Sequence, residues 1–168
     1  MDALKYLRSN RISLKDYISG RAFPKKPYEL KGSEDFMEAI KFNKINVVRQ
    51  AIVINPRYLY QYDYMRQTPF HWAAKLGYDE MLKLLCQYSK RLNMYDEHRR
   101  TPLFLAALFN QKKCVEILIN NGGNAFIVND EKLRPEDVTT DDDIYLILHD
   151  LSDKPLVKMR HYKSENWF

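Results

Sequence analysis

TPFHWAA at residues 68–74 decides the fold of this chain, because TPLFLAA repeats its pattern at residues 101–107. A sequence that resembles itself at a period of about 33 residues is typical of a solenoid. Each unit of a solenoid buries its apolar face only by stacking on its neighbours. The pattern therefore predicts a stacked array with one long side open for binding.

Two weaker units flank this clear pair. The same period carried forward from Thr101 reaches Arg134, and the small residues Thr139-Thr140 then take the place of Ala-Ala. A step of 34 residues back from Ala73 reaches Ala39. We therefore expect about four units, near residues 32–62, 66–95, 99–128 and 132–151.

Each unit is predicted to be a helix, a tight reversal, a second helix and a projecting loop, which we call a finger. In the second unit Thr68 can cap the first helix, and Pro69 suits its first position. Gly77 allows the reversal. Apolar residues then form one stripe on the second helix: Met81, Leu82, Leu85 and Cys86. In the first finger the alternation of tyrosines at residues 58–64 is typical of a strand.

The spacing and the Thr-Pro-x-x-x-Ala-Ala pattern resemble the ankyrin-repeat family over roughly residues 29–151. The resemblance implies an all-α solenoid of about four helix-turn-helix units with short β-hairpin-like fingers. The family's finger-turn glycine is present as Gly32, but Arg66, Arg99 and Lys132 replace it afterwards. We expect these three residues to be held in a left-handed conformation at some energetic cost.

Composition and length limit the class of protein. The 168 residues are 45% hydrophobic and 13% aromatic, which predicts one folded, soluble body with tails. There is no apolar run of about 20 residues and no apolar secretory segment after Met1, so we expect an intracellular protein. A cytoplasmic, cytoskeletal or ciliary place is preferred, with a mitochondrial one as the alternative. Cys86 and Cys114 fall on the apolar stripes, where reduced core residues are expected.

Catalysis is not indicated by any motif, and no cofactor or metal site is predicted. By resemblance to the family, His71 should bond the neighbouring finger rather than act on a substrate. The three acids at residues 141–143 lack the spacing of a calcium loop and precede a predicted helix, where acids suit the positive end of the helix dipole. We therefore expect that the chain is not an enzyme.

Partner binding is what the resemblance implies, through the fingers and through the residues between Ala-Ala and the reversal. An apolar row at the second of these places is typical of an interface, although the basic N-terminal segment could instead cover it. Arg66, Arg99 and Lys132 would line one edge, which would complement an acidic protein surface. The net charge of +5 is too modest to favour nucleic acid. The predicted partner-binding residues are Phe42, Tyr64, Met65, Arg66, Gln67, Lys75, Leu76, His98, Arg99, Arg100, Leu108, Phe109, Lys132, Trp167 and Phe168.

Extensions flank the predicted array at both ends. Residues 1–28 indicate two short helices and an extended Pro-containing segment, which either cap the first unit or dock on a partner. Residues 152–168 form a tail ending in Trp167-Phe168, which is either a partner anchor or a disordered end. The sequence thus favours a scaffold or structural subunit of a larger protein assembly. The alternative is a regulatory or inhibitory subunit that reversibly binds an enzyme or a transcription factor.

Overall fold

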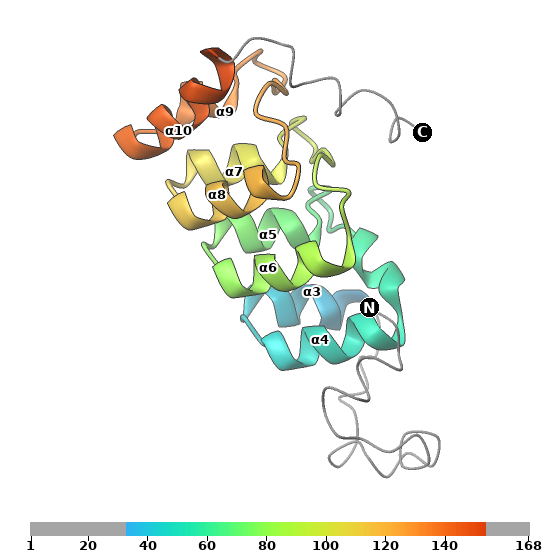
Figure 1. Cartoon of the computed structure of the whole chain (residues 1–168). Coiled ribbons are helices and arrows are strands. Elements are labelled where there is room, and N and C mark those ends of the chain that lie inside the picture. The colour runs from blue at the N-terminus through green and yellow to red at the C-terminus, as the bar shows by residue number, and fades with distance from the viewer. Residues whose placement is uncertain (1–32, 154–168) are drawn as a thin grey trace, which may run out of the picture.

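The computed structural model describes residues 33–153, and Figure 1 shows these residues as a stack of helix pairs. The predicted N-terminal helices, Gly32, Trp167 and Phe168 lie outside the described residues. Within this range the elements are all helical, as predicted, and no β-strand is present. None of the described helices is both long and apolar enough to cross a membrane.

Four pairs of helices follow one another along the chain, and in each pair a first helix packs beside a second. A short 3₁₀ helix, η1 (Pro56–Tyr60), follows the first pair. The pairs are α3 (Ser33–Lys41) with α4 (Ile45–Ile54), α5 (Pro69–Lys75) with α6 (Asp79–Tyr88), α7 (Pro102–Leu108) with α8 (Lys112–Asn120), and α9 (Pro135–Val138) with α10 (Asp142–Asp153).

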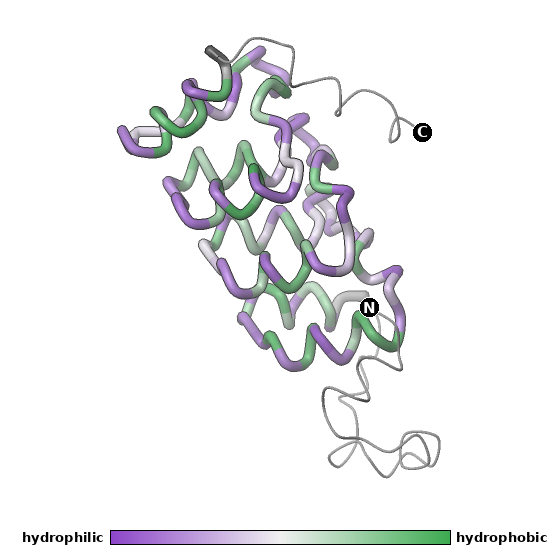
Figure 2. The backbone as a smooth tube through the Cα atoms, viewed as in Figure 1, coloured by the Kyte–Doolittle hydropathy of each residue, from purple (hydrophilic) through white to green (hydrophobic). Residues whose placement is uncertain are grey.

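The stacking follows from small and apolar residues at repeating positions. The alanine pairs at residues 73–74 and 106–107 are fully buried, so the helices of adjacent units approach closely. The predicted stripe of α6 is also buried, as are its counterparts Cys114, Val115 and Leu118 on α8. Figure 2 shows hydrophobic and hydrophilic stretches alternating along each helix, as expected for helices with one buried face.

The reversals within the first three units use residues with positive φ. Asn43, Gly77 and Asn110 have φ angles of 52°, 72° and 54°. A Cβ atom at Gly77 would also press against the side chain of Gln111 in the next unit. Glycine or asparagine at this place therefore lets the first helix turn sharply into the second.

The fourth unit departs from the predicted register. Tyr78, Gln111 and Asp141 each directly precede a second helix, but the step from Gln111 to Asp141 is three residues shorter than the step before it. The prediction that Thr139-Thr140 replaces Ala-Ala is wrong, since α9 ends at Val138. The two threonines lie in the reversal, where their hydroxyl groups bond the side chain of Asn110.

The strand-like interpretation of residues 58–64 is wrong, since no part of this segment is a β-strand. Asn55 accepts a hydrogen bond from the N–H of Arg57 at 3.1 Å, and Pro56 then begins η1 instead of a strand. Tyr58 stacks on Phe36 with ring centroids 5.1 Å apart, and the hydroxyl of Tyr60 donates to Ser89 Oγ at 3.3 Å. These two tyrosines thus tie the first finger to the helices.

Candidate protein-interaction surface

The three described fingers share one turn, built around Asp63, Asp96 and Asn129. These three residues recur at the period of the repeat. In each, the side-chain Oδ1 accepts from the backbone N–H groups two and four residues later, at 2.9–3.0 Å. The backbone N–H of the same residue donates to the carbonyl four residues later. These two carboxylates and this amide were not among the predicted site residues, although their spacing alone was a sufficient signal.

The tip of each finger carries the left-handed residue that the missing glycines predicted. Arg66, Arg99 and Lys132 have φ angles of 56°, 56° and 64°, which confirms that expectation. Backbone hydrogen bonds also join successive fingers, since the N–H of Glu97 donates to Met65 O at 3.0 Å. The N–H of Asp130 likewise donates to His98 O at 3.3 Å. The fingers therefore form one connected edge.

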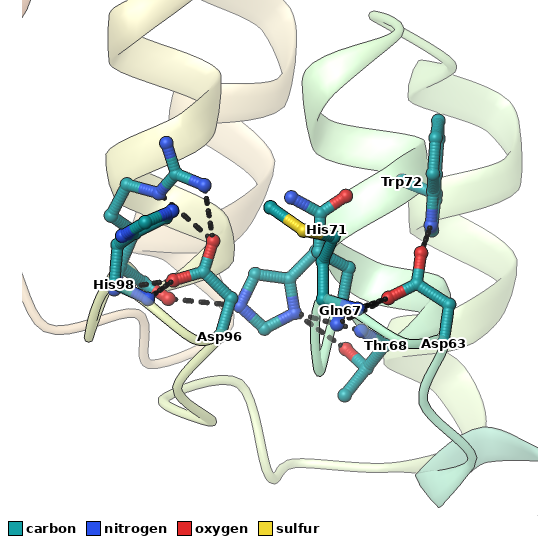
Figure 3. A network of polar contacts seen from close by, with 9 residues as sticks. Asp63, Gln67, Thr68, His71, Trp72, Asp96 and His98 are labelled. Atoms are coloured by element: carbon teal, nitrogen blue, oxygen red, sulfur yellow. Dashed lines mark hydrogen bonds and ion pairs between the residues drawn. The ribbon is translucent and has the colours of Figure 1, made fainter.

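His71 joins the start of its own helix, α5, to the neighbouring finger, as the resemblance implied (Figure 3). Its Nδ1 accepts from the N–H of Thr68 at 3.1 Å, and its Nε2 lies 3.0 Å from Arg100 O. Because one neighbour is an N–H and the other a carbonyl, the ring must be neutral with its hydrogen on Nε2. Burial lowers the pKa of His71, which is consistent with the neutral ring.

The predicted finger residues differ in how far they are available to a partner. Tyr64 is 89% exposed at the first tip, and Arg66, His98, Arg99 and Lys132 are also exposed. Gln67 is only 4% exposed, so its side chain offers little surface to a partner. Met65 and Arg100 are half-buried.

Charges of both signs share the finger edge. The guanidinium of Arg100 is bound to Asp96 at 2.8 Å, and Arg99 lies 3.8 Å from Asp130. Although burial alone would raise it, the pKa of Asp96 is lowered by its hydrogen bonds from Arg100 and His98. Glu97 and Glu131 are exposed beside these residues. The three cations that the sequence predicted along this edge therefore share it with acidic side chains.

A second surface lies where the first helices turn into the reversals. Phe42, Leu76, Leu108 and Phe109 are all exposed here, and Phe42 reaches 64%. The sequence placed these residues on the surface, and the structure confirms that position.

Lysines and aromatic rings meet along this surface. Lys41 Nζ lies 4.3 Å from the ring centroid of Trp72, and Lys75 Nζ lies 5.0 Å from the same ring. Lys75 also lies 5.4 Å from the ring of Phe109, and Lys44 Nζ lies 5.7 Å from the ring of Phe42. We call this set the lysine–aromatic strip: Lys41, Phe42, Lys44, Trp72, Lys75 and Phe109.

Trp72 is the central ring of the lysine–aromatic strip, and it was not among the predicted partner-binding residues. Its indole N–H donates to Asp63 Oδ2 at 2.9 Å, as Figure 3 shows, so the finger turn also holds the ring in place. Trp72 precedes Lys75 by three residues, a spacing that puts both on one face of a helix. That spacing could have identified Trp72 as a surface residue beside Lys75.

The other candidate groups are engaged in the fold. Asp141 Oδ1 accepts from the N–H of Ile144 at 3.0 Å and thus caps α10, while Asp143 pairs with Lys112 at 2.7 Å. Within residues 33–153 no group of three or more His, Cys, Asp or Glu is placed to hold a metal ion. Cys86 and Cys114 are unpaired and buried, and burial raises the pKa of their thiols to about 11 and about 12.

Known proteins resemble this chain in its repeat units. A family model described as ankyrin repeats, in three copies, matches residues 36–130. The chain is 28% identical over 96 residues to the serine/threonine-protein kinase VIK of Arabidopsis thaliana, which covers 57% of this chain and 22% of that protein. It is 31% identical over 87 residues to the putative E3 ubiquitin-protein ligase XBAT31 of the same plant, covering 51% and 19%.

A third relative is a regulatory protein. Over 87 residues the chain is 37% identical to protein phosphatase 1 regulatory subunit 12A of Mus musculus, covering 52% of this chain and 8% of that protein. The chain thus spans less than a quarter of the length of each of these three relatives.

Proposed function

Because the chain belongs to the ankyrin-repeat family, whose repeats are protein-interaction modules, we propose that it acts as a non-catalytic scaffold or structural subunit. It holds a partner protein against the surface formed by the ends of the first helices and the adjoining fingers. The kinase and the ligase noted above match only about half of this chain and less than a quarter of their own length, so their printed activities do not extend to it.

The observation that supports this proposal is the exposed apolar row at the helix ends. Phe42, Leu76 and Phe109 occupy the same place in three successive units, and each remains exposed. Large apolar side chains gathered on one face are typical of an interaction site. Stacked repeats place equivalent residues side by side, so a partner can contact all three at once.

A binding experiment with paired variants tests the proposal. The full chain is used to capture partners from native extract, and the capture is repeated with Leu76→Asp and Phe109→Asp combined. Loss of the same co-purifying protein in this variant is the expected result. Ile54→Asp is the matched control, because Ile54 is also an exposed apolar residue but lies at the end of α4. Unchanged capture by the double variant would rule out this surface.

A regulatory subunit is the second candidate, suggested by the 87 residues aligned with protein phosphatase 1 regulatory subunit 12A, which cover 8% of that protein. In this case the captured partner would be an enzyme or a transcription factor, bound reversibly. Measuring the partner's activity with and without the chain separates the two roles, since a scaffold binds without changing that activity.

A further inference from the structure

We propose that the lysine–aromatic strip binds an acidic peptide segment of the partner, one that carries an aromatic or aliphatic anchor residue among its carboxylates. This inference rests on the proposed function and adds the chemistry of the partner. The evidence is the position of Lys41, Lys44 and Lys75, their lack of ion pairs within residues 33–153, and the charges around them.

The three ammonium groups are held against rings and not against acids. Lys41 and Lys75 both lie over Trp72, and Lys44 lies over Phe42. An ammonium over an aromatic face keeps its N–H donors available on the side away from the ring. A carboxylate that approaches from solvent can therefore bond these lysines while an apolar neighbour packs on the rings between them.

Within residues 33–153, acidic side chains form no ion pair with the lysines of the lysine–aromatic strip, Lys41, Lys44 and Lys75. Asp63 is engaged by the indole of Trp72 and by its own finger turn. Glu38 precedes Lys41 by one helical turn on α3 but makes no ion pair with it. The cations are thus available to an external acid.

The chain's own extensions have the wrong charge to occupy this strip. Residues 1–32 contain eight Lys and Arg against three Asp and Glu, and residues 154–168 contain four against one. Residues 33–153 contain 15 basic and 18 acidic side chains, so the excess positive charge of the protein lies in the extensions. The lysines of the strip repel the basic side chains of the extensions, so at this strip the extensions are poorer occupants than an acidic segment of another protein.

Two synthetic 12-residue probes test the proposal on the full chain by fluorescence anisotropy. The acidic probe alternates Glu and Ser around a central Phe, and the neutral probe has Gln for every Glu. We expect the acidic probe to bind at least tenfold more tightly, with an affinity that falls as NaCl rises from about 50 to about 300 mM. Equal binding of the two probes, or no binding of the acidic probe up to millimolar concentration, would overturn the proposal.

Variants locate the binding. Lys41→Gln combined with Lys75→Gln should weaken the acidic probe at least fivefold and leave the neutral probe unchanged. Lys113→Gln is the matched control, because Lys113 is exposed on α8 and no ion pair with it is seen in the described residues. An equal loss in the control variant would mean that the probe senses net charge alone, and the proposal would fail. Thermal unfolding of each variant checks that the fold is unchanged, and Lys75→Arg should retain binding.

Other occupants would give different results. Cross-links between Lys75 and lysines of residues 1–32 in the chain alone would show that its own extension covers the lysine–aromatic strip, and a dimer abolished by Phe109→Asp would show a second copy there. Either result would overturn the acidic-partner proposal. If capture of the native partner is lost with Leu76→Asp and Phe109→Asp but persists when Lys41→Gln and Lys75→Gln are combined, the proposed function stands and this inference fails.

Discussion

His71 shows how much a single residue contributes to this fold. Its ring connects the N–H of Thr68, at the start of α5, to the carbonyl of Arg100 in the next finger. In the fourth unit Asp137 makes the first of these two bonds, since its Oδ2 accepts from the N–H of Arg134 at 2.7 Å. The third unit has Phe104 at this position, and Thr101 caps α7 instead.

His71→Phe should therefore lower the free energy of unfolding by about 1–3 kcal/mol, the cost of leaving a buried polar group without its partner. The group affected most is the buried N–H of Thr68, because the carbonyl of Arg100 keeps a hydrogen bond from the N–H of Asp96. Chemical denaturation of both proteins at pH 7.5 measures this difference. The variant copies the residue that the third unit already has, so the ring itself fits the repeat.

The same pair of proteins should differ in pH dependence. Burial holds the pKa of His71 below its ordinary value of 6.5, so the unfolded chain binds this proton more readily than the folded one. The stability contributed by the neutral ring is complete above pH 6.5 and declines as the pH falls below it. Between pH 7.5 and 5 the wild type should lose more stability than His71→Phe, and equal losses would contradict the assignment.

The two cysteines should be inert while the protein is folded. With thiol pKa values of about 11 and about 12 instead of 9.0, Cys86 and Cys114 have about a hundredfold and a thousandfold less reactive thiolate at neutral pH. Alkylation followed by mass spectrometry should find both thiols unmodified in buffer and modified in denaturant. Rapid labelling in buffer would mean that α6 and α8 separate readily.

At the scale of elements, the fingers combine a well-bonded turn with an unfavourable backbone angle at its tip. The carboxylate of Asp63 satisfies two N–H groups of the turn, but Arg66 must hold a φ angle of 56°. No ion pair or ring contact of Arg66 is seen in residues 33–153, so little offsets that cost.

Arg66→Gly should consequently raise the free energy of unfolding by about 0.5–1 kcal/mol, because glycine adopts positive φ without steric cost. Arg66→Ala removes the same side chain but keeps the Cβ atom, so it should give no such gain. Denaturant titration of the three proteins makes the comparison. A gain in the alanine variant would assign the effect to charge rather than to backbone strain.

The elements that sequence could predict are those with a strict period. The regular spacing of the units and the apolar stripes were sufficient for the helix pairs, because those features recur at fixed positions. The left-handed tips were predicted from the resemblance to the ankyrin-repeat family, which has a glycine at those positions. Two features without a period were missed. Alternating tyrosines indicated a strand where Asn55 and Pro56 start a 3₁₀ helix. The early end of α9 was hidden because the two threonines after it are small residues, like the alanines they seemed to replace.

The candidate surface was predictable in position more than in chemistry. The exposed apolar row could be located from the sequence, because its residues follow the Ala-Ala position in each unit and the resemblance assigns that position to partner contact. Trp72 and Lys41 lie in different units, and only the packing of one helix pair on the next brings them together. The burial of Gln67 likewise depends on the fold of its finger and not on a local pattern.

At the scale of the whole molecule, stability should vary along the stack. Each unit is supported mainly by its neighbours, so α5 to α8 are held from both sides, whereas α10 packs on a first helix of four residues. Hydrogen exchange should therefore find the amides of α10 opening well before those of α6 and α8. Equal protection throughout residues 33–153 would indicate that the array unfolds as one cooperative block.

The three residues missing from the fourth unit matter to anyone who wishes to lengthen this molecule. A grafted fifth repeat would have to stack on α9 and α10, a pair whose first helix stops at Val138. The helices of a repeat copied from the regular units would not align with this shortened pair. Restoring one helical turn after Val138 before adding modules should bring the junction back into step with the rest of the array.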